Sequence, residues 1–189
     1  MSYLDESAAQ LAIFEASIPW MYLDSRGYVT VGVGDMLPNV TSAQALAFVD
    51  SSSQPASPAA ILADFQRVAA MTSNLTANAY RTATALQLPT DAVTALLMAR
   101  IRDFDQNLSA KFSGYSTFPD PAKLGLLDMI FNLGAYKLFS TYPTFMRYVE
   151  NTDWAGAALQ CHRNGPSPAR NAWTVQQFNL AASLQAPSQ

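Results

Sequence analysis

Two carboxyl groups and a hydroxyl near the start of the chain have the types and spacing needed for acid-assisted hydrolysis. Glu15 is followed by Asp24 nine residues later and by Thr30 six residues after that. Glycosidases use two such acids, one to protonate the leaving oxygen and one to handle water or the developing positive charge. A hydroxyl between them can orient the water. By residue type alone, the same three positions also suit a helix-end acid, a turn acid and a β-branched strand residue.

Other hydrolytic chemistries are poorly supported. Cys161 is the single cysteine and His162 the single histidine, so an internal disulfide or a cysteine-based metal site cannot form. The two are neighbours on a predicted helix, where adjacent side chains diverge, which disfavours a Cys–His catalytic pair. We expect a buried, apolar role for Cys161 and a structural or exposed one for His162. No metal and no cofactor are expected.

The charge and hydropathy patterns exclude several partners. The net charge is -3, whereas non-specific nucleic-acid binding needs a basic face. Residues 1–60 hold six acids and one base, and residues 123–170 hold five bases and three acids, so a local basic wall is still available. No apolar run of about 18 residues occurs, and the acidic N-terminus lacks the features of a secretory signal. We expect no nucleic-acid partner and no stable membrane insertion.

The element pattern predicts an α+β, mostly α-helical protein. A first helix over 2–17 is followed by a β-hairpin within 20–37, where Val29, Val31 and Val33 alternate with other residues. Residues 51–58 read as a loop, and 72–89 are not assigned. Further helices are predicted at 42–50, 57–71, 90–112, 120–133, 142–150, 153–162 and 168–184. We expect one domain over 1–189, with a small lobe over 1–60, a helical lobe over 61–189 and a cleft between them.

The segment from Glu15 to Gly34 resembles the active-site segment of the phage-type lysozymes, glycoside hydrolase family 24, which includes phage endolysins. That family carries Glu, eight residues, Asp, five residues, Thr, and this chain matches without a gap at Glu15, Asp24 and Thr30. The family's G-Y-x-T-x-G-x-G strand is also present, from Gly27 to Gly34. Downstream, residues 126–134, 153–158 and 168–171 are similar to later helices of the family. The match covers about 5–37 and 120–180, and the insert 38–119 does not align.

The resemblance implies a lysozyme-like fold and cleavage of the β-1,4 bond between N-acetylmuramic acid and N-acetylglucosamine in peptidoglycan. Glu15 would be the general acid, and Asp24 and Thr30 would hold the attacking water. Inversion at the anomeric carbon is implied, which requires more widely spaced carboxylates than retention does.

The resemblance to the phage-type lysozymes also implies a set of substrate-binding residues. Tyr22 and Tyr28 would stack on sugar faces, near the strand glycine Gly34. Asn132 would bind N-acetyl groups. Arg170 would reach the cleft from the helical lobe and pair with Glu15 or with a substrate oxygen.

Two other functions remain open at this point: a lysozyme-like module that binds glycan without cleaving it, and a hydrolase of chitin or chitosan oligomers. The implied partner is the peptidoglycan glycan strand, met by a monomer. With no signal peptide, the protein would reach the periplasm or cell wall through a holin or a secretion machine. A weaker resemblance, to secreted antibacterial toxins, adds an immunity protein as a candidate partner.

Overall fold

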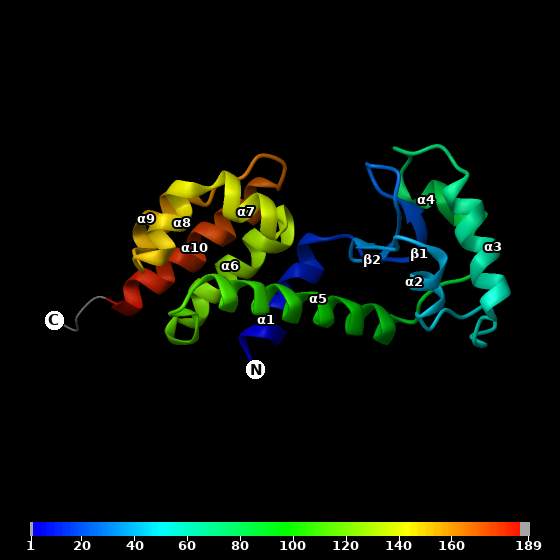
Figure 1. The fold of residues 1–189 in the computed structure, drawn as a ribbon, viewed down its shortest axis with the longest axis horizontal. Coiled ribbons are helices and arrows are strands. Elements are labelled where there is room, and N and C mark those ends of the chain that lie inside the picture. The colour runs from blue at the N-terminus through cyan, green and yellow to red at the C-terminus, as the bar shows by residue number, and fades with distance from the viewer. Residues whose placement is uncertain (1, 186–189) are drawn as a thin grey trace. The chain divides into compact units, whose positions relative to one another are not determined.

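The computed structural model describes residues 2–185, and within them the chain is mostly helical with one small sheet (Figure 1). The described residues form two compact units. The first, here called the hairpin unit, is residues 15–97. The second, the helical unit, is residues 2–14 together with 98–185. The expected class, α+β and mostly α-helical, is confirmed at this level.

The sheet of the hairpin unit is antiparallel, with strand order β1 (Ile18–Leu23), β2 (Val29–Gly32), β3 (Asp35–Met36). Tyr22 pairs with Thr30 and Leu23 with Val29, while an irregularity between Ile18 and Tyr22 shifts the register. Because directly opposed residues share a face, Leu23 and Val29 mark one face and Tyr22 and Thr30 the other. The predicted hairpin is therefore present, with a short third strand added.

Three helices follow the sheet in the hairpin unit. Helices α3 (Pro58–Ala69) and α4 (Ala77–Tyr80) both contact β1, and α2 (Val40–Gln44) packs against α3. The Trp20 indole Nε1 donates to the Ala77 carbonyl at 2.9 Å. The buried Asp64 carboxylate of α3 accepts from the backbone N–H groups of Ala85 and Leu86, both at 2.9 Å, and pairs with Arg67. These bonds fix the segment after α4, which the sequence left unassigned, to α3.

The predicted helix over 42–50 is wrong from residue 45 onward. Helix α2 ends at Gln44, and Val49 instead forms β-bridges with Pro55 and Gln87. The expected loop at 51–58 is a turn in which the Asp50 carboxylate accepts from two backbone N–H groups. The backbone N–H and C=O groups of Val49 thus bond to Gln87 instead of to the neighbouring turns of a continuing helix.

The helical unit contains α1 (Tyr3–Phe14), α6 (Asp120–Leu133), α7 (Ala135–Thr141), α8 (Pro143–Glu150), α9 (Trp154–Gln160) and α10 (Pro168–Gln185). Helix α5 (Thr90–Lys111) begins in the hairpin unit and continues into this one. Helix α6 packs against α1 and α10, and α10 also packs against α9. Helix α7 was missed because Gly134, at φ 77°, ends α6 and α7 follows at once, without a capping side chain to signal it.

Helix α1 is held in the helical unit by a polar cluster. The Tyr3 hydroxyl lies 2.9 and 3.0 Å from the two Asp105 carboxylate oxygens, and the Tyr115 hydroxyl donates to Asp105 Oδ1 at 2.6 Å. Burial and the bond to Asp105 raise the pKa of Tyr3 to about 12. The Lys123 ammonium sits 4.9 Å from the Tyr3 ring centroid. Tyr3 thereby links α1 to α5 through Asp105 and to α6 through Lys123.

Helix α1 is also shorter than expected. It ends at Phe14 rather than Ser17, because Ile18 already pairs with Gly32 in the sheet and Pro19 follows.

The unit boundaries differ from the lobes expected at 1–60 and 61–189, because α3 and α4 pack against the hairpin and belong to its unit. Within residues 2–185, none of the helices combines the length and apolar character needed to cross a bilayer.

We expect Gly125→Ala to destabilise the helical unit by about 1–3 kcal/mol through overpacking. A Cβ at this α6 position would lie 2.8 Å from Phe178, whose ring is fully buried and cannot move aside. In an open helix the same change would stabilise by about 0.5–1 kcal/mol. Urea unfolding measures the effect, and the double variant with Phe178→Leu should recover part of it. A stabilised single variant would contradict the packing described.

Candidate active site

Asp24 is held rigidly in the turn between β1 and β2. Its Oδ1 accepts from the backbone N–H groups of Arg26 and Tyr28, both at 2.9 Å. The turn is closed by backbone bonds from Asp24 to Tyr28 and from Gly27 to Asp24, and Gly27 takes the positive φ of 82° that the turn requires. The second oxygen, Oδ2, lies 3.7 Å from Arg26 Nε, and the side chain is 23% exposed. The turn thus fixes Oδ1 and leaves Oδ2 at the partly exposed side.

Thr30 lies on β2, opposite Tyr22 of β1 and Met36 of β3. Its side chain is almost fully buried, and its Oγ1 donates to the Tyr28 carbonyl at 2.9 Å. A hydroxyl has one proton and two lone pairs, so this bond commits the proton and leaves the oxygen as an acceptor. The Thr30 hydroxyl is therefore oriented to receive a hydrogen bond.

Tyr28 connects these two groups through its own backbone. Its N–H binds Asp24 Oδ1 and its C=O binds Thr30 Oγ1. Tyr28 thus positions both the Asp24 carboxylate and the Thr30 hydroxyl, the two groups predicted from sequence to hold the water. The arrangement is local and depends on the G-Y-x-T order of residues 27–30.

Glu15 follows the last residue of α1 and lies in a bend before β1, with an intermediate exposure. The sequence placed it inside the last helical turn, which is wrong by one residue. Phe14, directly before it, is packed by α10: the Trp173 ring lies edge-on at 5.6 Å and the Arg170 guanidinium lies 5.4 Å from the Phe14 centroid. These contacts fix the end of α1, from which Glu15 leaves.

The aromatic residues predicted to contact sugar differ in exposure. Tyr28 is 49% exposed, and the Arg26 guanidinium carbon lies over its ring, 5.2 Å from the centroid. Tyr22 is half-buried on the face shared with Thr30. Gly34 is exposed, at φ 77° between β2 and β3. Tyr28 and Gly34 thus offer surface to a ligand, and Tyr22 offers part of its ring.

Asn132 and Arg170 belong to the helical unit. Asn132 is exposed in the last turn of α6. Arg170 is 5% exposed at the start of α10, and its Nε donates to Asp128 Oδ1 at 2.7 Å. A site shared by these two residues with Glu15 and Asp24 stays a prediction.

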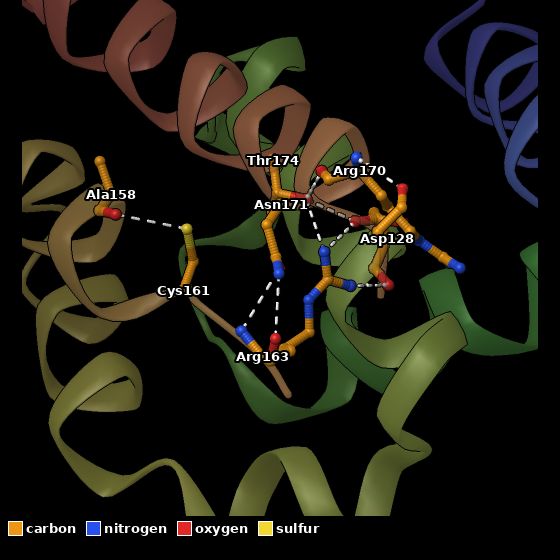
Figure 2. Close-up of polar contacts among 8 residues, drawn as sticks. Asp128, Ala158, Cys161, Arg163, Arg170, Asn171 and Thr174 are labelled. Atoms are coloured by element: carbon orange, nitrogen blue, oxygen red, sulfur yellow. Dashed lines mark hydrogen bonds and ion pairs between the residues drawn. The ribbon is translucent and has the colours of Figure 1, made fainter. Parts of the chain in front are cut away.

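A buried polar cluster surrounds Asp128 in the helical unit (Figure 2). Arg163 Nη2 binds Asp128 Oδ2 at 2.6 Å and the Thr174 hydroxyl at 2.7 Å, and Nη1 binds the Asp128 carbonyl at 3.0 Å. Asn171 accepts from the Arg163 N–H and donates to its carbonyl oxygen. One carboxylate thus holds two guanidinium groups, from Arg163 and Arg170.

The sequence reasoning did not single out this cluster. A signal was present, because Asp128 interrupts the apolar run of residues 126–131 and a carboxylate buried on such a helix needs a partner. Which arginine fills that role depends on the path of the chain 35 residues later, and the local pattern does not contain it.

Cys161 and His162 lie just beyond α9. Cys161 is fully buried, its thiol donates to the Ala158 carbonyl at 3.3 Å, and burial raises its pKa to about 11. The expected apolar role of Cys161 is confirmed, and His162 is exposed as expected. Across residues 2–185, no group of three or more His, Cys, Asp and Glu side chains is placed to hold a metal ion.

No protein-family model and no curated protein matches the chain.

Proposed function

We propose that this protein is a lysozyme-like glycoside hydrolase that cleaves the β-1,4 bond between N-acetylmuramic acid and N-acetylglucosamine in peptidoglycan. The observation that carries the proposal is the anchoring of Asp24 and Thr30 on the two sides of the Tyr28 backbone. These bonds join Asp24 and Thr30, two of the three residues whose spacing resembles that of the phage-type lysozymes.

The hydrogen-bond pattern suits a hydrolytic water. A water that donates one proton to Asp24 Oδ2 and the other to Thr30 Oγ1 keeps a lone pair directed at the anomeric carbon. The Thr30 oxygen can accept that bond because its own proton is committed to Tyr28. Asp24 Oδ1 is saturated by two N–H groups, so the carboxylate holds its orientation while Oδ2 takes up the proton.

The reaction then balances in one displacement. Glu15 protonates the O4 oxygen of the leaving N-acetylglucosamine, the glycosidic bond breaks, and the water oxygen bonds to C1 of N-acetylmuramic acid. The water proton passes to Asp24, which then releases it to solvent, and Glu15 regains a proton from solvent. Attack from the face opposite the leaving group inverts the anomeric carbon. The product is a glycan fragment with a reducing muramic acid end.

Thr30 offers a sharp test of this geometry. We expect Thr30→Val to reduce the turnover of peptidoglycan by about 10–100-fold, because the water loses one of its two fixed acceptors. Thr30→Ser keeps the hydroxyl and should stay within about threefold of wild type by the same reasoning. The measurement is the release of new reducing ends from purified sacculi, together with binding of the variants to the same sacculi.

The controls for this test concern folding and substrate. Both variants should show the circular dichroism and the melting temperature of a folded protein, since valine keeps the branched shape of threonine and serine keeps its hydroxyl. Chitin and chitosan oligomers in parallel reactions identify a shifted substrate. A Thr30→Val variant as active as wild type would contradict the proposed role of the hydroxyl.

A further inference from the structure

The hairpin unit is acidic, yet the proposed substrate carries carboxylates. Residues 15–97 contain six acids and three bases, the bases being Arg26, Arg67 and Arg81. A glycan strand bearing negative charge therefore meets net repulsion here unless a cation is placed at the site. The positions of the three arginines show whether a cation lies at the candidate site.

Two of these arginines serve the fold. Arg67 pairs with the buried Asp64 carboxylate, and its Nε donates to the Ala83 carbonyl at 2.9 Å. Arg81 donates to the Thr84 carbonyl at 3.1 Å and lies 5.3 Å from the Trp20 ring centroid. Both guanidinium groups are held by the segment that connects α3 to α5.

Arg26 is different, because it lies in the turn that holds Asp24. Its side chain is 71% exposed, its Nε is 3.7 Å from Asp24 Oδ2, and its guanidinium carbon lies over the half-exposed Tyr28 ring, 5.2 Å from the centroid. A guanidinium placed over an aromatic ring has a planar fork of N–H donors that can bind a carboxylate through two parallel bonds. Lysine has no planar fork of this kind.

We propose that Arg26, whose guanidinium lies over the Tyr28 ring, is a specificity-determining residue that binds a carboxylate carried by the muramic acid residue of the substrate. The inference rests on the proposed function and deepens it, because neutral chitin-type glycans lack this group. The carboxylate has two sources in peptidoglycan: the lactyl group of a peptide-free muramic acid, and the acids of the peptide stem. Either would lie beside the turn, where the positive charge of Arg26 offsets the negative charge of the carboxylate.

The test is a binding comparison on the full chain with three probes. They are peptide-free muramic acid–N-acetylglucosamine oligomers with free lactyl carboxylates, N-acetylglucosamine oligomers of equal length, and purified sacculi with their stems. The proteins are wild type, Arg26→Ala, Arg26→Lys and the control Arg102→Ala, which removes one exposed arginine from α5 of the helical unit.

We expect Arg26→Ala to weaken binding of the carboxylated oligomer about 5–20-fold, with binding of the neutral oligomer unchanged within about twofold. Arg26→Lys should recover only part of the loss, and Arg102→Ala should match wild type. The loss should shrink as salt is added, because the contact is exposed. If the loss occurs on sacculi and not on the peptide-free oligomer, the stem is the source of the carboxylate.

The outcomes separate this inference from the proposed function. Equal weakening on charged and neutral oligomers, or no weakening on any probe, overturns the role of Arg26 even where wild type cleaves peptidoglycan. Arg26-dependent binding without release of reducing ends supports the carboxylate site and contradicts the hydrolase. A wild-type protein that binds none of the three probes contradicts both.

Discussion

Glu15→Gln should reduce the cleavage of peptidoglycan by about 10²–10⁴-fold, the usual contribution of a general acid. Glutamine keeps the size and the hydrogen-bonding capacity of the side chain but cannot supply the proton that the leaving oxygen needs. Glu15 directly follows α1, and Trp173 and Arg170 pack against the preceding Phe14, so the backbone position should persist in the variant. The measurement is the rate of reducing-end release from sacculi, with binding to sacculi measured in parallel.

The matched control is Glu6→Gln, the same change at an exposed position on α1. It should retain full activity. Binding by Glu15→Gln should remain close to that of wild type, because the acid acts mainly in the transition state. A Glu15→Gln variant that cleaves sacculi at nearly the wild-type rate would remove Glu15 from the mechanism.

Asp128→Ala should destabilise the helical unit by about 3–5 kcal/mol, the cost typical of breaking a buried ion pair from one side. The carboxylate holds Arg163 at 2.6 Å and Arg170 at 2.7 Å, and the Arg163 and Asp128 side chains are nearly inaccessible to water. Its loss leaves both guanidinium groups without the charge they share. The melting temperature should fall by roughly 6–20 °C.

Two further variants show whether this cost comes from the buried charge. Asp91→Ala removes an exposed acid at the start of α5 and should change stability by no more than about 0.5 kcal/mol. The double variant Asp128→Leu with Arg163→Met replaces the pair by apolar groups and should recover part of the loss. An Asp128→Ala variant destabilised by less than about 1 kcal/mol would show that water or rearrangement satisfies the arginines.

The elements that the sequence predicted well are those whose pattern is local. The hairpin follows from alternating valines and the turn residues at 24–27, and α5, α6 and α10 were predicted within one or two residues of their observed ends. Failures occur where distant partners intervene. Val49 leaves the expected helix to pair with Gln87, and Ile18 shortens α1 by pairing with Gly32.

The same distinction applies to the candidate site. Asp24, Tyr28 and Thr30 could be selected from sequence because their geometry is set within one turn. The position of Arg26 was overlooked, although its place between Asp24 and Tyr28 was visible in the same run. The bond from Arg170 Nε to Asp128, which lies 42 residues earlier, was not predicted, and the expected role of Arg170 toward Glu15 or a substrate oxygen stays a prediction. No local pattern encodes such a partner.

The most direct test of the central proposal is mass spectrometry of the products that wild type and Glu15→Gln release from purified peptidoglycan. The proposal predicts fragments with hydrolysed, reducing N-acetylmuramic acid ends from wild type, and a loss of these fragments in the variant. Reducing N-acetylglucosamine ends, 1,6-anhydro ends, or no soluble fragments from folded wild type would contradict it.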